Sequence, residues 1–337
     1  MRRLPVFIVL DVSESMAGGP IKEVRSGLQL LTDALMSDPF ALETVHISVI
    51  AFAGKAKTIV PLTYILDFEP PELPVGSGTN LTEALHLLMH EIDTNVKKNT
   101  PDAKGDWKPL VFILTDGSPN DDYKAAAAQW KMKYGKFATV AVLMGEHSDA
   151  TALKAVTDNV LVFKDTTKES YRAFFKWVSF SIQTSSKAIG EQGRENPNDF
   201  DKIRENMEKD LLAENLPTEN NVEFFVIPAR CQKSGKPYIV RYVRKGNAKR
   251  FVSDGAYPVD ESYFEFSGSE KKREINWEKF DDTVPECPYC HATILGFCSC
   301  GNVSCLTEGH LENVKCPHCG VTGDFGGSVA SVAGGRG

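Results

Sequence analysis

The sequence has no long apolar run, and this absence is the first limit on what the protein can be. No uninterrupted hydrophobic stretch approaches the roughly 20 residues that a helix needs to cross a bilayer. The apolar residues from Leu4 to Leu10 are too few for a signal peptide, and no small-residue cleavage site follows them. We therefore expect a cytoplasmic protein with no membrane segment.

An excess of positive charge is also missing. The chain has 38 Lys and Arg against 45 Asp and Glu, which gives a net charge of -7. Proteins that bind nucleic acid normally carry a basic footprint, so we do not expect nucleic acid as a partner. The 337 residues exceed what one compact core usually serves, and two or three folding units are expected.

Cysteine is nearly absent outside one short segment. Seven of the eight cysteines lie between Cys287 and Cys319, and Cys231 stands apart. In a chain without an export signal, clustered thiols are better explained by metal binding than by disulfides. For Cys231 we predict a plain structural role.

The first half of the chain alternates short apolar runs with longer amphipathic segments. This alternation is typical of an α/β domain with a doubly wound, mostly parallel sheet covered by helices. We predict that this domain spans residues 1–188. Strands are predicted at 6–10, 45–52, 110–114, 138–144 and 160–163, and helices at 21–36, 81–96, 123–133 and 171–182.

The second half is organised differently. Residues 189–221 are polar and read as a linker, with a hint of helix at Ile203, Met207, Leu211 and Leu212. Residues 222–322 combine short β-rich runs with the cysteine cluster, which predicts a small, β-rich, zinc-ribbon-like domain. The glycine-rich tail, 323–337, lacks material for a core and is predicted to be flexible.

Polar side chains follow two predicted strands and precede one predicted helix. Asp11, Ser13 and Ser15 come directly after the first strand, Asp116 follows the strand 110–114, and Thr79 lies in a glycine-containing loop. Asp-x-Ser-x-Ser alone is more often a turn or a helix cap. Since ligands gather at the carboxyl ends of strands in such sheets, the three loops together predict one metal site. Its hard oxygen ligands suit Mg²⁺ and tolerate Mn²⁺.

The cysteine cluster predicts structural zinc. Seven thiols and one imidazole would fill two closed tetrahedral zinc sites. The eight predicted ligands are Cys287, Cys290, Cys298, Cys300, Cys305, His310, Cys316 and Cys319.

Two divisions of these ligands stay open. The pairs 287/290 and 316/319 could share one ion, which leaves 298, 300, 305 and 310 for the other. In a crossed arrangement, 287 and 290 join 305 and 310, while 298 and 300 join 316 and 319. His291 and His318 are rival imidazoles with poorer placement. Because the segment 286–322 has little apolar material, metal should supply most of its folding free energy.

The oxygen-ligand pattern resembles the metal-ion-dependent adhesion site (MIDAS) of von Willebrand factor A domains, over residues 4 to about 188. The resemblance implies that Ser13, Ser15 and Thr79 are close ligands and that Asp11 and Asp116 act mainly through water. It also implies that a partner's carboxylate often completes the shell. With the cysteine-rich module added, the chain resembles the TerY-like proteins of bacterial tellurium-resistance systems. That resemblance implies association with a protein kinase and a PP2C-type phosphatase in stress-linked phosphorylation.

These features together favour a non-catalytic, metal-dependent adaptor that captures an acidic side chain of a partner. The alternative is a metal-dependent phosphohydrolase. An aspartyl-phosphate phosphatase needs a second acid two residues after its nucleophile, and Ser13 occupies that position, so we do not expect an enzyme. The segment 230–250 holds eight Lys or Arg residues, which either meet a phosphorylated or acidic partner or form a solvated β face.

Overall fold

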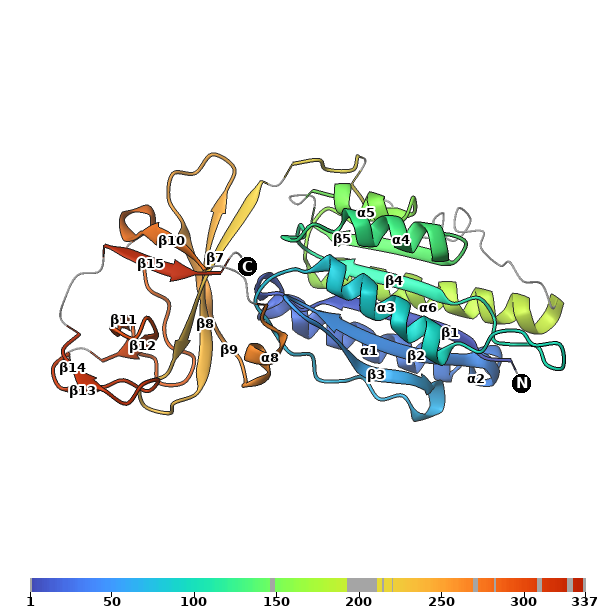
Figure 1. The fold of residues 1–337 in the computed structure, drawn as a ribbon, viewed down its shortest axis with the longest axis horizontal. Coiled ribbons are helices and arrows are strands. Elements are labelled where there is room, and N and C mark those ends of the chain that lie inside the picture. The colour runs from blue at the N-terminus through green and yellow to red at the C-terminus, as the bar shows by residue number, and fades with distance from the viewer. Residues whose placement is uncertain are drawn as a thin grey trace.

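The structure is a computed structural model of the chain. It describes residues 2–145, 149–192, 211–213, 215–219, 221–268, 272–281, 283–307, 311–325 and 330–335. An N-terminal α/β domain and a C-terminal β-rich domain lie side by side, with the short helix α8 (Ser262–Phe266) between them (Figure 1).

A six-stranded sheet forms the middle of the N-terminal domain, in the order β3-β2-β1-β4-β5-β6. All neighbours are parallel except β3, which pairs antiparallel with β2 at the edge. Edge strand β3 is half-buried and was not among the predicted strands, because its alternating polar residues lack the continuous apolar run of a central strand. The strands are β1 (Leu4–Asp11), β2 (Val45–Phe52), β3 (Ala56–Tyr64), β4 (Leu110–Thr115), β5 (Ala138–Met144) and β6 (Val160–Phe163).

Helices cover both faces of this sheet, as a doubly wound fold requires. One apolar cluster joins the sheet to α1 and α6 through residues such as Leu28 and Phe174. A second cluster joins the other face to α3 and α4 through Leu85 and Trp130. The helices are α1 (Gly19–Met36), α2 (Pro39–Thr44), α3 (Leu81–Asn95), α4 (Lys124–Tyr134), α5 (Thr151–Val156) and α6 (Lys168–Gln192), with short 3-10 turns η1 (Glu14–Met16) and η2 (Ile65–Asp67). The predicted fold class of this domain is confirmed.

The C-terminal domain is built on a five-stranded sheet in the order β11-β12-β7-β8-β9. Its core is aromatic, with the ring of Phe280 in contact with the rings of Phe225, Tyr242 and Phe251. The strands are β7 (Val222–Arg230), β8 (Pro237–Lys245), β9 (Val252–Pro258), β11 (Ile294–Phe297) and β12 (Val303–Leu306). Smaller pairs are β10 (Arg273–Asn276) with β15 (Ser331–Gly334) and β13 (Val314–Lys315) with β14 (Thr322–Gly323); η4 (Trp277–Lys279) follows β10. The β-rich prediction is confirmed.

Two predicted boundaries need correction. Helix α6 continues to Gln192, past the predicted helix end at 182 and the predicted domain end at 188, because it packs along α1 on the sheet. Part of the predicted linker belongs to the N-terminal domain: Ala213 N donates to Val162 O at 2.8 Å, and Leu211 and Leu212 pack on its core. Ile203 and Met207 lie outside the described residues.

The tail also differs from its prediction. Residues 331–334 form β15, which pairs with β10, and Val332 is buried against the C-terminal core. Gly335 then exchanges two backbone hydrogen bonds with Val226, at 2.8 and 3.3 Å. A short segment of small residues can therefore be ordered by adding a strand to an existing edge. Among the helices of the described ranges, none combines the length and apolarity required to span a membrane.

Candidate metal centres

The first centre is a cluster of buried oxygen atoms at the carboxyl end of β1. Asp11 ends this strand, and its Oδ1 accepts a 2.8 Å hydrogen bond from Ser13 N. The turn η1 then brings Ser15 back, so that Ser13 Oγ and Ser15 Oγ lie 2.9 Å apart. Ser15 Oγ donates at 2.7 Å to Asp116 Oδ1, which follows β4. Four of the five predicted ligands are thus joined in one hydrogen-bonded group.

Thr79 enters from the loop before α3. That loop is tied to the β1 loop by a bridge between Gly76 and Ser13, with Gly76 N donating to Val12 O at 2.9 Å. Thr79 is buried, and its backbone exchanges 3.1 Å hydrogen bonds with Asn120, close after Asp116. The three predicted loops therefore meet at one edge of the sheet.

The electrostatics of this cluster favour a bound cation. Burial and the neighbouring Asp116 charge raise the pKa of Asp11 to about 7, against hydrogen bonds from Thr115 and Ser13 that lower it. Burial also raises the pKa of Asp116, while Ser15 and the charge of Arg241 act in the opposite direction. Two carboxylates in one buried site repel each other, and a divalent cation between them would remove that cost. Hydroxyls and carboxylates are the donors that Mg²⁺ and Mn²⁺ take.

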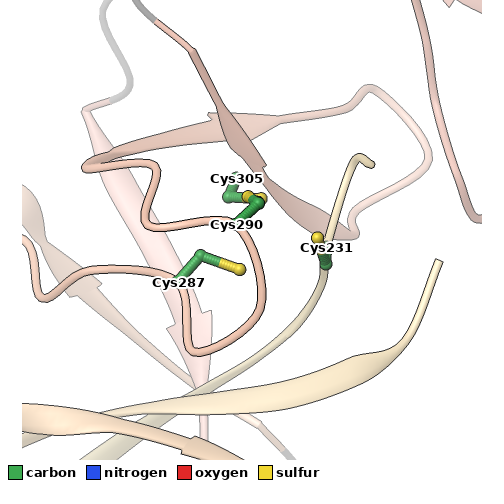
Figure 2. Close-up of side chains that lie close together, drawn as sticks. All are labelled: Cys231, Cys287, Cys290 and Cys305. Carbon is green, nitrogen blue, oxygen red and sulfur yellow. The ribbon is translucent and has the colours of Figure 1, made fainter. Parts of the chain in front are cut away.

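The second centre is a group of four thiols in the C-terminal domain. Figure 2 shows the side chains facing one another, with Cys287 and Cys290 on one loop and Cys231 and Cys305 on other segments. Their sulfur atoms all lie within 4.8 Å of one another, and they belong to Cys231, Cys287, Cys290 and Cys305. Zn–S bonds of about 2.3 Å in a tetrahedron place sulfur atoms roughly 3.8 Å apart. The observed 3.5 Å between Cys290 Sγ and Cys305 Sγ is close to that spacing.

The third centre is a second four-thiol group, also within 4.8 Å, made of Cys298, Cys300, Cys316 and Cys319. Sulfur pairs across it are 3.8 Å (Cys298 to Cys319) and 3.9 Å (Cys300 to Cys316) apart. The hydrogen bond from Asn302 is the main cause that lowers the pKa of Cys300 to about 6. A thiol that ionises readily is ready to bind zinc.

These two groups decide between the divisions that the sequence left open. Cys298 and Cys300 lie with Cys316 and Cys319, as in the crossed arrangement. In the other group Cys231 stands where the sequence predicted His310, which lies outside the described residues. The prediction of a plain structural role for Cys231 was therefore wrong, because β7 carries this distant residue to the cluster.

A local signal for Cys231 is present in its turn. Cys231 N donates to Lys236 O, and Gly235 N donates back to Cys231 O. The turns that begin at Cys287 and Cys316 have the same two hydrogen bonds. In each, the cysteine N donates to the carbonyl five residues later, and the cysteine carbonyl accepts from the N four residues later. Gly235, like Gly320, has a positive φ, near 70°. The pattern Cys-x3-Gly at 231–235 repeats that at 316–320, with Ser234 in place of the second cysteine.

The basic segment 230–250 does not form one free surface. Three of its arginines make ion pairs within the C-terminal domain: Arg230 with Glu261, Arg241 with Asp254, and Arg244 with Glu223. The other five residues lie at the two ends of β8, on separate turns; they are Lys233, Lys236, Lys245, Lys249 and Arg250.

Comparisons with known proteins match both halves of the chain. The family model described as von Willebrand factor type A domain matches residues 6–177, and the TerY-C metal binding domain matches residues 221–337. An uncharacterized protein of Synechocystis sp. is 33% identical over 125 residues, which are 34% of this chain and 26% of that protein. The chain thus spans about a quarter of that relative.

Solved structures resemble about half of the chain. Proximal thread matrix protein 1 from the mussel byssus is 19% identical, with a TM-score of 0.41, covering 54% of this chain and 48% of that one. A von Willebrand factor type A protein from Catenulispora acidiphila is 17% identical, with a TM-score of 0.41, covering 54% of this chain and 43% of that one.

Proposed function

Because the chain belongs to the von Willebrand factor type A family, we propose that it is a non-catalytic, metal-dependent adaptor. The observation that carries the proposal is the convergence of Asp11, Ser13, Ser15 and Asp116 in one buried oxygen cluster. The C-terminal domain beside it carries two four-thiol groups suited to zinc. The first centre would bind a partner, and the other two would be structural.

Mg²⁺ or Mn²⁺ is the proposed ion at the oxygen cluster. Ser13, Ser15 and Thr79 would hold it through their hydroxyls, with Asp11 and Asp116 supplying negative charge. The bound ion would supply an electrophilic site for a carboxylate of a partner. The protein's own part is to hold these oxygens in place, with Asp11 fixed by Thr115 Oγ1 at 2.5 Å.

We propose a protein kinase and a PP2C-type phosphatase as partners, in the cytoplasm and in a tellurium-resistance or related stress response. The support is the resemblance to the TerY-like family together with the match of residues 221–337 to its metal binding domain. A phosphorylation system of this kind needs a component that brings kinase, phosphatase and substrate together. A domain that binds carboxylates through a cation can do so reversibly.

An affinity capture experiment tests the metal-dependent part. Wild type and the double variant Ser13→Ala, Ser15→Ala are immobilised and exposed to lysate with Mg²⁺, or after exchange into Mg²⁺-free buffer. EDTA is avoided because it would also strip zinc. The matched control is Ser26→Ala, Ser37→Ala, whose hydroxyls bond only to backbone carbonyls of α1. We expect partners on wild type and control in Mg²⁺ alone; partners retained under every condition would contradict the proposal.

No catalytic role is proposed for Glu14, the carboxylate within the Asp-x-Ser-x-Ser motif. It is buried and accepts hydrogen bonds from Tyr263 Oη and from Ser77 Oγ, so it is not a solvated loop carboxylate. A general base needs to reach a substrate proton, which these contacts prevent. Mn²⁺-dependent hydrolysis of p-nitrophenyl phosphate that is lost in Asp11→Ala would instead establish the phosphohydrolase alternative.

A further inference from the structure

The C-terminal domain donates hydrogen bonds to the backbone of the loop that carries the Asp-x-Ser-x-Ser motif. Arg241, in the middle of β8, is only 6% exposed. Its Nη1 donates to three backbone carbonyls of the loop, at 2.8 Å to Glu14, 2.6 Å to Ser15 and 3.2 Å to Ala17. A single guanidinium of the C-terminal domain therefore satisfies the backbone of the turn that holds Ser13 and Ser15.

Arg241 is itself held rigidly before it reaches the loop. Its Nε makes a 2.5 Å ion pair with Asp254, and its Nη2 donates to Tyr257 Oη at 3.1 Å. The guanidinium carbon also lies 4.5 Å from the centre of the Tyr257 ring. Because the planar guanidinium is fixed on several sides, its hydrogen bonds constrain the loop and do not merely follow it.

A second contact links the same loop to the loop of Thr79. The Glu14 carboxylate accepts from Ser77 Oγ at 3.2 Å, and also from Tyr263 Oη of α8. Ser77 in turn accepts backbone hydrogen bonds at its carbonyl from Gly54 and Gly268, at 2.9 and 3.3 Å. Two of the three loops of the oxygen cluster are thus joined through residues that the C-terminal domain contacts.

We propose that Arg241 is a positioning residue for the oxygen cluster of the N-terminal domain: it fixes the loop carbonyls so that Ser13 and Ser15 present their hydroxyls to a cation. The proposal rests on the proposed metal-dependent function and adds its regulation. Because the hydrogen bonds of Arg241 and the bound cation act on the same loop, cation binding and the contact between the domains are thermodynamically linked. Cation affinity therefore depends on the packing of the C-terminal domain against the loop, and the bound cation stabilises that packing.

The positive charge of Arg241 would by itself oppose a nearby cation, so two effects compete. The Asp254 ion pair offsets much of this charge, and the Nη1 hydrogens point at carbonyl oxygens. We expect the preorganisation of the loop to outweigh this repulsion. The two effects predict opposite outcomes when the side chain is replaced by methionine, which keeps an unbranched apolar stem and removes the charged guanidinium.

The test measures Mg²⁺ and Mn²⁺ dissociation constants by calorimetry on the full-length, zinc-loaded chain. Arg241→Met is expected to weaken cation binding roughly 10- to 100-fold, the effect of losing hydrogen bonds from a charged group. Arg241→Lys keeps the positive charge but loses the planar guanidinium. Its cation dissociation constant should lie between those of wild type and Arg241→Met. Arg244→Met is the matched control on the same strand, because Arg244 binds Glu223 within its own domain, and its affinity should stay within about threefold of wild type.

A second variant guards against loss of folding. Tyr263→Phe removes only the hydroxyl that donates to Glu14, and a drop of roughly threefold is expected. Hydrogen exchange supplies the reciprocal readout: Mg²⁺ should slow amide exchange in α8 of wild type but not of Arg241→Met. Unchanged or tighter cation binding in both Arg241→Met and Tyr263→Phe overturns the proposal. Wild type that binds no cation refutes the metal-dependent function itself, which is a distinct result.

Discussion

Replacing Cys231 is the sharpest test of how the zinc centres are built. Cys231 is fully buried, and its sulfur lies within 4.8 Å of those of Cys287, Cys290 and Cys305. Its pKa is lowered to about 7: burial opposes ionisation, but hydrogen bonds from the side chain and backbone of Ser234 outweigh it. A thiol in the turn between β7 and β8 that ionises this readily is suited to bind zinc. We expect Cys231→Ala to weaken one zinc centre and spare the other.

The size of the effect follows from the ligand count. Structural zinc supplies about 10–16 kcal/mol of binding free energy, so one ligand of four accounts for about 3 kcal/mol. A loss of that size lowers zinc affinity about 100-fold. The centre made by Cys298, Cys300, Cys316 and Cys319 should keep its full affinity, because Cys231 is not part of it.

The assay is titration with a series of zinc chelators of graded strength, read by a chromophoric indicator. Wild type should release two ions, and Cys231→Ala should release one of them at a lower chelator strength than wild type does. Ser234→Ala is the control for the turn, and Cys319→Ala should weaken the opposite centre. Two ions with unchanged affinity in Cys231→Ala would refute the assignment. Weakening by His310→Ala in place of Cys231→Ala would restore the ligand set predicted from the sequence.

Three further predictions concern stability. A strong chelator should make the segment 286–322 sensitive to protease while residues 4–188 stay resistant, because the thiol groups hold short strands with little apolar burial; persisting resistance of the segment would count against it. Gly27→Ala should destabilise the N-terminal domain by about 2 kcal/mol in urea denaturation, since the added Cβ would lie 1.9 Å from the Phe175 ring between α1 and α6. Glu223 has a lowered pKa, because hydrogen bonds from Arg273 and Arg244 outweigh its burial. The stability that ionised Glu223 supplies is therefore complete above the ordinary pKa of a carboxyl group, and it is lost as the pH falls through the lowered pKa of the folded state. Melting temperatures of Glu223→Gln should therefore decline less with acid than those of wild type.

The sheet and the oxygen cluster were predictable because their signals are local. Each central strand is a continuous apolar run, and a parallel sheet brings the ends of such runs to one edge. Asp11 and Asp116 each follow a run of this kind directly. Edge strand β3 lacks that signal, since one of its faces meets solvent and its composition is mixed.

The zinc ligands were predictable only in part. Pairs such as Cys316-x2-Cys319 lie on one turn, so their spacing reports their geometry. The Cys-x3-Gly turn at 231–235 is a local signal for Cys231, but the residue reaches its group through the register of β7 with β8 and β12, which the nearby sequence does not encode. The same reason explains β15, whose small residues acquire a strand only because the edge of β10 is there to pair with.

The contact between the domains could not be predicted from the sequence for a further reason. The motif Asp-x-Ser-x-Ser specifies no residue at its x positions, so it says nothing about the role of the residue found there. Glu14 sits between the two serines, and burying a carboxylate is costly unless its hydrogen bonds are supplied. Tyr263 and Ser77 supply them, and Arg241 satisfies the carbonyls on the same turn. Residues 1–219 alone, which keep the segment that packs on the N-terminal core, would return Glu14 and these carbonyls to water and free the turn. We therefore expect the isolated N-terminal domain to bind Mg²⁺ at least as weakly as full-length Arg241→Met, because it loses the Tyr263 contact as well. Calorimetry on the two proteins makes the comparison, and isolated-domain affinity equal to that of the intact chain would show that the turn holds its shape unaided.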